Sequence, residues 1–523
     1  MKLQQISRFF VLVVLLLFSA CSKDIENLET LPTAGPASTD ASAGSWRMNV
    51  LTSATQIPVP APAAVTSDAY RAELEAVKAA QGKLTPEQRQ MVAYWSAGGV
   101  LRWNQFLREL VARFNLPPTP LPDGTYPTPD AENPFGNPEF PFANPPYAAR
   151  AYGYVSVGQY EALKAAWAYK YQYNRPAPYQ VDNGVVALVP KSDLPAYPSE
   201  DAVLSGVSAE LLKVLFPAAV REITLKAAEQ RQAALLAGKA VASDVSAGLA
   251  LGKSVAAVVL ARAASDGMRT AVGTSAQWKL LEDNTVAKGE IPWKSLDIPS
   301  RPPMLPFFGL RQIGNTAVGV RCWNLTDSEL ISIRPGPPPP TSSQEMAADL
   351  AEVKFYARNI TRDRLAIVHK WADGAGTYTP PGHWNDIAAE YIAEARMSEV
   401  RAARAFALLN MAIHDAGVAC WEVKYFYYNP RPAQLDPAIK TATGVPNFPA
   451  YTSGHSTFSG AAATVLAYLF PQEANFFHEQ AREASMSRVY GSIHYRIDCE
   501  VGLEHGKQVA QYTVNAARAD NSN

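Results

Sequence analysis

The chain has 523 residues, enough for two or more domains with a large hydrophobic core. Its 47 basic and 48 acidic residues nearly balance, and the formal net charge of −1 argues against a nucleic-acid partner. Beyond the N-terminus, no stretch reaches the roughly 18 uninterrupted apolar residues that a membrane-spanning helix needs, so none is predicted.

The N-terminus has the order of segments found in a bacterial lipoprotein signal. A charged start precedes an apolar run at residues 9–18, and small residues then stand directly before Cys21. By this resemblance, residues 1–20 are a signal peptide, Cys21 carries the lipid, and residues 21–67 form a flexible tether. We therefore expect an extracytoplasmic lipoprotein, held to a membrane only by its N-terminal lipid and located at the outer membrane.

After the tether, apolar residues recur mostly at helical spacing, and alternating strand-like runs are scarce. Helices are expected over residues 74–80, 87–114, 148–171, 202–215, 223–264, 346–356, 383–425, 456–468, 473–490 and 501–517. The predicted fold class is therefore all-α, built from helical bundles. Two proline-rich insertions, residues 117–146 and 303–340, are expected to be long loops of the kind that often cover a site.

The chain also repeats itself at an offset of 254 residues. The matching pairs include Trp167 with Trp421, Lys170 with Lys424, Ser199 with Ser453, and Gly252-Lys253 with Gly506-Lys507. We therefore predict two tandem helical bundles related by a pseudo-twofold axis. The expected N-terminal bundle covers residues 68–267, a connecting segment covers 268–361, and the C-terminal bundle covers 362–523.

The two copies differ at positions that could carry chemistry. The first copy has Glu200, Asp201, Ala234 and Ala240 where the second has Gly454, His455, Arg488 and His494. An acidic pair repels an anion, and the first copy lacks both imidazoles. The sequence therefore predicts an active site in the C-terminal bundle only.

Three short runs in the second copy supply this chemistry. They are Lys424-x6-Arg431-Pro432, Ser453-Gly454-His455 and Ser487-Arg488-x5-His494-x3-Asp498. The cations and the free N–H groups expected at a helix N-terminus suit the oxygens of a tetrahedral oxyanion. Of the two histidines, one could attack or ligate the oxyanion while the other moves protons.

The third run also carries a prediction about helix geometry. Ser487, His494 and Asp498 would share one face of a continuous helix, so that Asp498 could accept the second ring N–H of His494. On a continuous helix, the Arg488 side chain would lie on a different face from His494. It could then approach the site only by extending its long side chain around the helix, unless the helix breaks near Gly491.

These runs resemble the signature of the superfamily that joins type 2 phosphatidic acid phosphatases, bacterial class A acid phosphatases and vanadium-dependent haloperoxidases. The family pattern is Lys-x6-Arg-Pro, then Pro-Ser-Gly-His, then Ser-Arg-x5-His-x3-Asp, and this chain departs from it only at Thr452. Residues 448–455 are most similar to the chloroperoxidase branch. The close resemblance covers about residues 401–517.

The resemblance implies a role for each matching residue. The oxygens of vanadate or phosphate would be bound by Lys424, Arg431, Ser453, Gly454 and Arg488. His494 would ligate vanadium or act as the nucleophile of a phosphatase, and His455 would be the acid–base residue. Phe448 resembles the aromatic residue of a halide pocket. Asp415 could orient His455 or pair with Arg488, and a buried, satisfied pair with His414 is an equal alternative.

The leading hypothesis is a haloperoxidase that binds vanadate and oxidises halide with hydrogen peroxide. The alternative is an acid phosphatase that hydrolyses phosphate esters at the same residues and needs no cofactor. A third interpretation is a lipoprotein that binds phosphate or glycans without catalysis. The sequence leaves halide preference, the natural substrate and a homo-oligomeric state open.

The remaining cysteines and histidines carry less information. Cys322, Cys420 and Cys499 match no zinc pattern and are expected to be buried apolar residues, although one disulfide stays open. Residues 369–371 and 381–384, which contain two more histidines, are interpreted as structural. A metallohydrolase is not favoured, because no expected helix offers two histidines at metal-ligand spacing.

Overall fold

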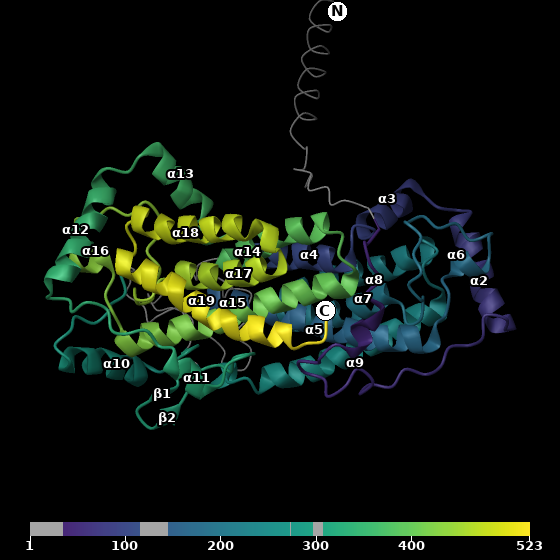
Figure 1. Ribbon diagram of the computed structural model, residues 1–523, viewed down its shortest axis with the longest axis horizontal. Coiled ribbons are helices and arrows are strands. Elements are labelled where there is room, and N and C mark those ends of the chain that lie inside the picture. The colour runs from purple at the N-terminus through teal and green to yellow at the C-terminus, as the bar shows by residue number, and fades with distance from the viewer. Residues whose placement is uncertain (1–34, 116–144, 272, 297–306, 523) are drawn as a thin grey trace, which may run out of the picture. The chain divides into compact units, whose positions relative to one another are not determined.

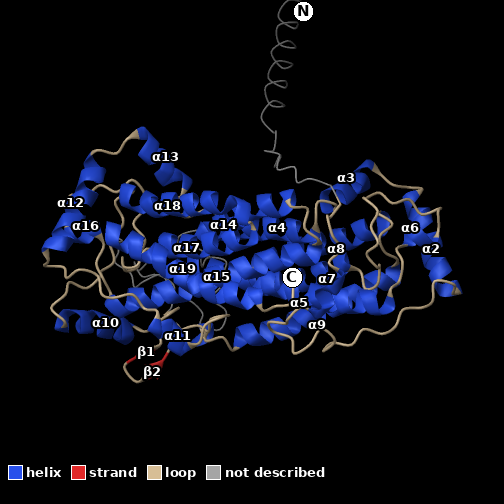
Figure 2. Ribbon diagram, in the orientation of Figure 1, coloured by secondary structure: helices blue, strands red, loops and turns tan. Residues whose placement is uncertain are grey.

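The computed structural model describes residues 35–115, 145–271, 273–296 and 307–522. The expected signal peptide, Cys21 and nearly all of the first proline-rich insertion lie outside these residues, as does the start of the second insertion. Within the described residues the secondary structure elements are helices, apart from one short hairpin, as Figure 2 shows. The prediction of an all-α fold is therefore confirmed.

The elements are labelled in Figure 1. In the first half they are η1 (Ala41–Ser45), α2 (Asp68–Gln81), α3 (Pro86–Trp95), α4 (Gly99–Phe114), α5 (Pro145–Tyr173), α6 (Pro178–Val181), α7 (Glu200–Leu215), η2 (Pro217–Ala219), α8 (Val220–Leu236) and α9 (Ala242–Ala264). The connecting segment holds η3 (Met268–Thr270), α10 (Ser275–Ala287), β1 (Gln312–Ile313), β2 (Thr316–Ala317), α11 (Asp327–Ser332) and α12 (Gln344–Arg358). The second half holds α13 (Arg362–Lys370), α14 (Thr379–Glu394), α15 (Glu399–Tyr427), α16 (Pro432–Leu435), α17 (Gly454–Leu469), η4 (Pro471–Glu473), α18 (Ala474–Tyr490) and α19 (Arg496–Arg518).

The long helices that the periodicity predicted are interrupted at local breaks. Residues 87–114 split at Gly98, which has a φ of 116°, and residues 223–264 split around Gly238 at a φ of 75°. Residues 383–425 split where Arg396 has a φ of 49° and Ser398 caps α15 by accepting a hydrogen bond from the Arg401 amide. Apolar spacing continued across each break, so it did not show where one helix ended.

The expected tether is partly wrong. Trp46, in the middle of that segment, is 2% exposed, and η1 packs against α5. Side chains of the first half also donate to the backbone of this segment, from Trp167 Nε1 to Thr39 O at 2.8 Å and from Tyr197 Oη to Pro60 O at 2.7 Å. Residues 35–67 are therefore part of the folded body.

The duplication is visible in equivalent hydrogen bonds. Arg150 Nε lies 2.7 Å from Asp266 Oδ2 in the first copy, and Arg404 Nε lies 2.7 Å from Asp520 Oδ2 in the second. The two long helices α5 and α15 pack along each other near the middle of Figure 1. Across this contact Asn410 Nδ2 donates to Ser156 Oγ at 2.9 Å, and these two residues occupy matching positions of the repeat. Contact between matching positions is what a pseudo-twofold axis produces.

In each copy two long helices pack closely at glycines, α7 with α9 in the first copy and α17 with α19 in the second. A Cβ on Gly252 of α9 would lie 2.3 Å from Val203 O of α7, and one on Gly506 of α19 would lie 2.0 Å from the matching Thr457 O of α17. By length and composition alone, residues 242–270 could cross a membrane, a test that core helices of soluble proteins also pass. The packing of α9 on α7 gives this apolar helix a partner inside the protein.

Candidate active site

The three sequence runs meet at one end of the second bundle. Lys424 lies near the end of α15, Arg431 follows the break at Asn429-Pro430, and Ser453 caps α17. Arg488 lies in the last turn of α18, and His494 lies between α18 and α19. The helix breaks near Gly491, with Ser492 at a φ of 60°, so the continuous helix is a wrong prediction and the break brings Arg488 and His494 to the same cavity.

Lys424 and Arg431 are buried cations held by carbonyl groups. Lys424 Nζ donates to Pro449 O and Ala450 O, both at 2.9 Å, and to Thr452 O. Arg431 Nε donates to Phe448 O at 2.9 Å, and its Nη2 has no hydrogen-bond partner among the described residues. Burial lowers the pKa of Lys424 to about 7 and that of Arg431 to about 10. Both groups would gain from a nearby anion.

Ser453 and Gly454 form the N-terminus of α17 beside these cations. Ser453 Oγ accepts from the Ser456 amide at 3.4 Å, and the Ser453 amide donates to Asp498 O at 2.9 Å. A Cβ on Gly454 would lie 3.1 Å from the Trp421 ring, so a side chain there would meet the cavity wall. The positive end of the helix dipole adds to the attraction for an anion.

His494 has one ring nitrogen held by Asp498 and the other in contact with Arg431. Its Nδ1 lies 2.9 Å from Asp498 Oδ2, which also accepts from the Tyr495 amide at 3.1 Å. Asp498 therefore holds the tautomer with the proton on Nδ1, and Nε2 accepts from Arg431 Nη1 at 2.8 Å. Burial, followed by the charges of Arg431 and Lys424, lowers the pKa of His494 well below its usual value. The Nε2 lone pair is thus free of a proton at neutral pH.

Arg488 and His455 complete the site. Arg488, 1% exposed, donates from Nε to Ser487 Oγ at 2.9 Å and from Nη2 to Trp371 O, and burial lowers its pKa to about 10. Burial and the charge of Arg488 lower the pKa of His455 well below its usual value. His455 Nε2 has no hydrogen-bond partner among the described residues.

Two functional candidates were not among the predicted site residues: His383, whose segment was interpreted as structural, and Asp373, for which nothing was predicted. Asp373 Oδ2 lies 3.8 Å from His455 Nε2, and its side chain is 5% exposed. His383 Nδ1 lies 3.1 Å from Asp373 Oδ1, and its ring stacks on Trp371 with centroids 4.2 Å apart. Asp373 lies in the loop between α13 and α14, outside the three runs. No motif or spacing in the sequence indicated that the Asp373 carboxylate would lie in the site.

Phe448 lies at the site and Asp415 does not. The Phe448 ring lies 5.0 Å from the Arg431 guanidinium and 5.1 Å from Lys424 Nζ, and it lines the cavity. Asp415 accepts instead from the amides of Trp323 at 2.7 Å and Asn324 at 2.8 Å, and it pairs with His414. Of the two alternatives for Asp415, the buried pair with His414 is the one observed.

Several of these residues line one cavity of about 470 Å³. We call the predicted set of anion donors the oxyanion cradle, which consists of Lys424, Arg431, Ser453, Gly454 and Arg488. Of the predicted site residues, Gly454, His455, Arg488, His494 and Phe448 line the cavity directly. Within the described residues no group of three His, Cys, Asp or Glu side chains is placed to hold a metal ion. Cys322, Cys420 and Cys499 are buried and unpaired.

A comparison with protein families identifies this part of the chain. Residues 404–519 match the model of the PAP2 superfamily. The C-terminal region is a PAP2 superfamily domain. The family resemblance of the three runs is therefore confirmed, and every residue of the cradle lies inside the PAP2 domain.

A solved structure shares the fold beyond the PAP2 domain. A structure described as the first bacterial vanadium-dependent iodoperoxidase is 22% identical with a TM-score of 0.55, over 83% of this chain and 96% of that chain. A holo-type bacterial vanadium-dependent chloroperoxidase is 15% identical with a TM-score of 0.48, over 76% and 97%. The first likeness shows a common fold, and the second is too distant to support an argument. No curated protein was found to match the chain.

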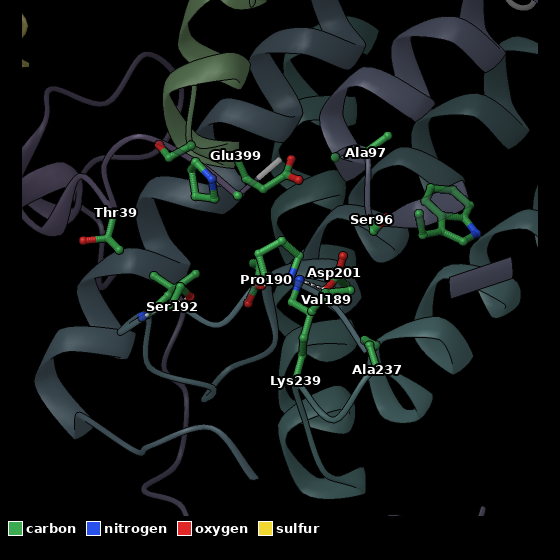
Figure 3. Close-up of a pocket in the computed structure, with 18 of the residues that line it drawn as sticks. Thr39, Ser96, Ala97, Val189, Pro190, Ser192, Asp201, Ala237, Lys239 and Glu399 are labelled. Atoms are coloured by element: carbon green, nitrogen blue, oxygen red, sulfur yellow. Dashed lines mark hydrogen bonds and ion pairs between the residues drawn. The ribbon is translucent and has the colours of Figure 1, made fainter. Parts of the chain in front are cut away.

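The first copy, outside the PAP2 domain, has an internal carboxylate at the position that corresponds to the candidate anion site of the PAP2 domain. Glu200 lies 2.8 Å from Lys170 Nζ and 2.8 Å from Lys239 Nζ. Burial alone would raise the pKa of Glu200, but these two ammonium groups outweigh it and hold the pKa below its ordinary value. The cavity here is about 140 Å³, and Figure 3 shows Lys239 reaching Asp201 within it. The contacts thus neutralise the charges of the first copy internally.

Proposed function

We propose that this protein is an enzyme of the vanadium-dependent haloperoxidase type, which oxidises halide with hydrogen peroxide at a vanadate held by His494. The observation that carries the proposal is the unprotonated His494 Nε2 within a set of three buried cations. The first copy keeps matching lysine and serine residues but lacks this imidazole.

The donors of the site fit an oxyanion such as vanadate. Arg431 Nη2 is buried without a partner among the described residues, and Arg431 Nη1 contacts His494 Nε2, the atom that would bind the metal. Lys424, Arg431 and Arg488 would neutralise the oxygens, and the N-terminus of α17 would add backbone N–H donors. When bound, vanadate supplies the Lewis-acid centre that makes peroxide reactive toward halide.

The protein's own groups would control protons at this centre. His455 is neutral in the ligand-free protein, so it can take a proton from hydrogen peroxide, and Asp373 stabilises the imidazolium that results. His383 orients the Asp373 carboxylate through the 3.1 Å contact. Asp498 holds His494 in the tautomer whose Nε2 faces the cradle. The proposed acid–base residue is thus His455, with Asp373 and His383 positioning it.

An acid phosphatase is the second candidate. The same unprotonated His494 Nε2 could attack a phosphate ester, because the cradle would bind phosphate oxygens as it binds vanadate oxygens. His455 would then protonate the leaving group. The two activities share every residue of the site and differ in whether vanadate is required.

The test is to measure halide oxidation and phosphatase turnover on the same purified protein. Halogenation of a dye is followed with peroxide and each halide, with and without added vanadate, beside hydrolysis of a generic phosphate ester. We expect vanadate-dependent halogenation that His494→Ala abolishes. His478→Ala is the matched control, because His478 lies on α18 and does not line the cavity. Phosphate release without halogenation would favour the phosphatase, and unchanged vanadate binding in His494→Ala would overturn both candidates.

A further inference from the structure

A second cavity, of about 550 Å³, lies where the two copies of the repeat meet. Its wall contains residues of α5 and α9 from the first copy, residues of α15 and α19 from the second, and the segments 47–50 and 321–324. Arg262 and Ala516, which occupy matching positions of the repeat, both line it. The cavity therefore lies beside the pseudo-twofold axis, and it shares no lining residue with the cavity of the oxyanion cradle.

Two buried carboxylates hold the outer segments of this cavity in place. Glu161 accepts hydrogen bonds from the backbone amides of residues 49–51, at 2.8, 2.9 and 2.8 Å. Asp415 accepts from the amides of residues 323–324, at 2.7 and 2.8 Å. Glu161 and Asp415 occupy matching positions of the repeat. Each copy thus uses the same position of its long helix to fix one side of the cavity.

Three arginines line this cavity without a carboxylate partner. They are Arg47 and Arg321, which are exposed, and Arg262, which is half-buried. Within the described parts of the chain none of the three forms an ion pair. The Arg262 guanidinium lies 3.5 Å from the centroid of the Trp323 ring, a contact that holds the group at the wall. Three like charges around one cavity repel one another, and a bound anion would relieve the repulsion.

The acidic side chain of the lining does not neutralise these arginines. Asp520 Oδ2 accepts from Arg404 Nε at 2.7 Å, and Asp520 Oδ1 accepts from the Ser522 amide at 3.0 Å. Tyr160 also lines the cavity; it is 2% exposed, and its hydroxyl has no hydrogen-bond partner among the described residues. A buried hydroxyl without a partner is costly, and a ligand oxygen would satisfy it. The cavity therefore combines unpaired positive charge with an unused donor.

We propose that this cavity binds a small organic polyanion, which carries two or more carboxylate or phosphate groups. Guanidinium groups bind both kinds of group through paired N–H donors, and three arginines suit a ligand with more than one of them. The volume of about 550 Å³ falls in the size range of sites for organic ligands, typically ~300–1,000 Å³, so one inorganic phosphate would contact only part of the wall. The inference does not depend on the proposed function, because no residue of the oxyanion cradle takes part.

The test is isothermal titration calorimetry on the full chain without vanadate, with citrate as the carboxylate probe and methylenediphosphonate as the phosphate-class probe. We expect saturable binding of at least one probe, and the tighter probe identifies the class. Arg47→Gln combined with Arg321→Gln removes two exposed cations and should weaken binding at least about tenfold. Arg89→Gln combined with Arg221→Gln is the matched control, because it removes the same charge from exposed arginines outside the cavity.

Arg488→Gln separates this cavity from the oxyanion cradle. Arg488 belongs to the cradle and does not line the second cavity, so binding of the probe should survive this change. Binding that is lost in Arg488→Gln but kept in the Arg47 and Arg321 double variant would place the probe in the cradle and overturn the inference. The absence of saturable binding by both probes would also overturn it. Binding that the double variant weakens, in a protein without halide oxidation or phosphatase turnover, would support this site and reject the proposed function.

Discussion

Lys424 is a charged group that the ligand-free protein holds at a cost. It is completely buried and donates only to carbonyl groups. Its pKa falls from 10.5 to about 7 because burial disfavours the ammonium form. Between these values the unfolded chain binds more protons than the folded chain, so this group makes stability rise with pH from about 7 to 10.5. Below pH 7 Lys424 is charged in both the folded and the unfolded chain, so the full free-energy cost of burying its ammonium group applies.

Lys424→Met should therefore stabilise the ligand-free protein while abolishing oxyanion binding. We expect a gain of about 3 kcal/mol in the free energy of unfolding at pH 7, shrinking as the pH rises toward 10.5. Urea denaturation at pH 7 and pH 10 measures the difference, and phosphate titration measures the lost binding. A variant that is less stable than wild type at pH 7 would show that the charged lysine stabilises the empty site.

At the residue scale, the sequence predicted contacts between residues at a short fixed spacing, but it did not predict contacts between residues far apart in the chain. The spacing of His494 and Asp498 predicted their contact correctly, although the helix that carries Asp498 starts only at Arg496. His383 lies in a segment that was interpreted as structural, and nothing was predicted for Asp373, because the closeness of Asp373 to His455 depends on how a loop folds against α17. Such a contact has no signature in one sequence.

At the element scale, the packing of α17 on α19 positions the site. Gly506 brings α19 so close to α17 that the Ser453 amide can donate to Asp498 O at 2.9 Å. This contact fixes the start of α17 relative to the start of α19, and hence the cradle relative to His494. The matching contact of the first copy, between the Ser199 amide and Asp244 O at 3.0 Å, has the same geometry.

Gly506→Ala should force these helices apart. Its Cβ would lie 2.0 Å from a backbone oxygen, which cannot move aside as a side chain can. We expect a loss of about 3 kcal/mol in the free energy of unfolding, together with weaker phosphate binding. Gly336→Ala is the control, since its Cβ would meet nothing within 4 Å. Denaturant unfolding of both variants measures the difference, and equal stabilities would refute the tight packing.

At the scale of the whole molecule, two copies of one bundle have different charge arrangements. The second copy has three buried cations, to which we propose that an external anion binds, whereas the first satisfies two lysines with Glu200. We expect equilibrium dialysis to show one phosphate or vanadate bound per chain. Glu200→Ala should leave Lys170 buried without its carboxylate and lower the free energy of unfolding by about 3–5 kcal/mol. Two anions bound per wild-type chain would contradict the conclusion that Glu200 neutralises the lysines of the first copy.

The sequence alone determined the helical class, the duplication and most of the site, because helix periodicity and short fixed spacings are local properties. The resemblance of the three runs to the family signature led to the prediction that Lys424, Arg431, Ser453, Arg488 and His494 belong to one site. Only the tertiary structure decided the breaks within the long apolar runs, the folding of residues 35–67 onto the body and the partner of Asp415. It also joined Asp373 to His455 and brought Arg47, Arg262 and Arg321 to one cavity. These features depend on contacts between segments far apart in the chain, and the packing of whole helices sets those contacts.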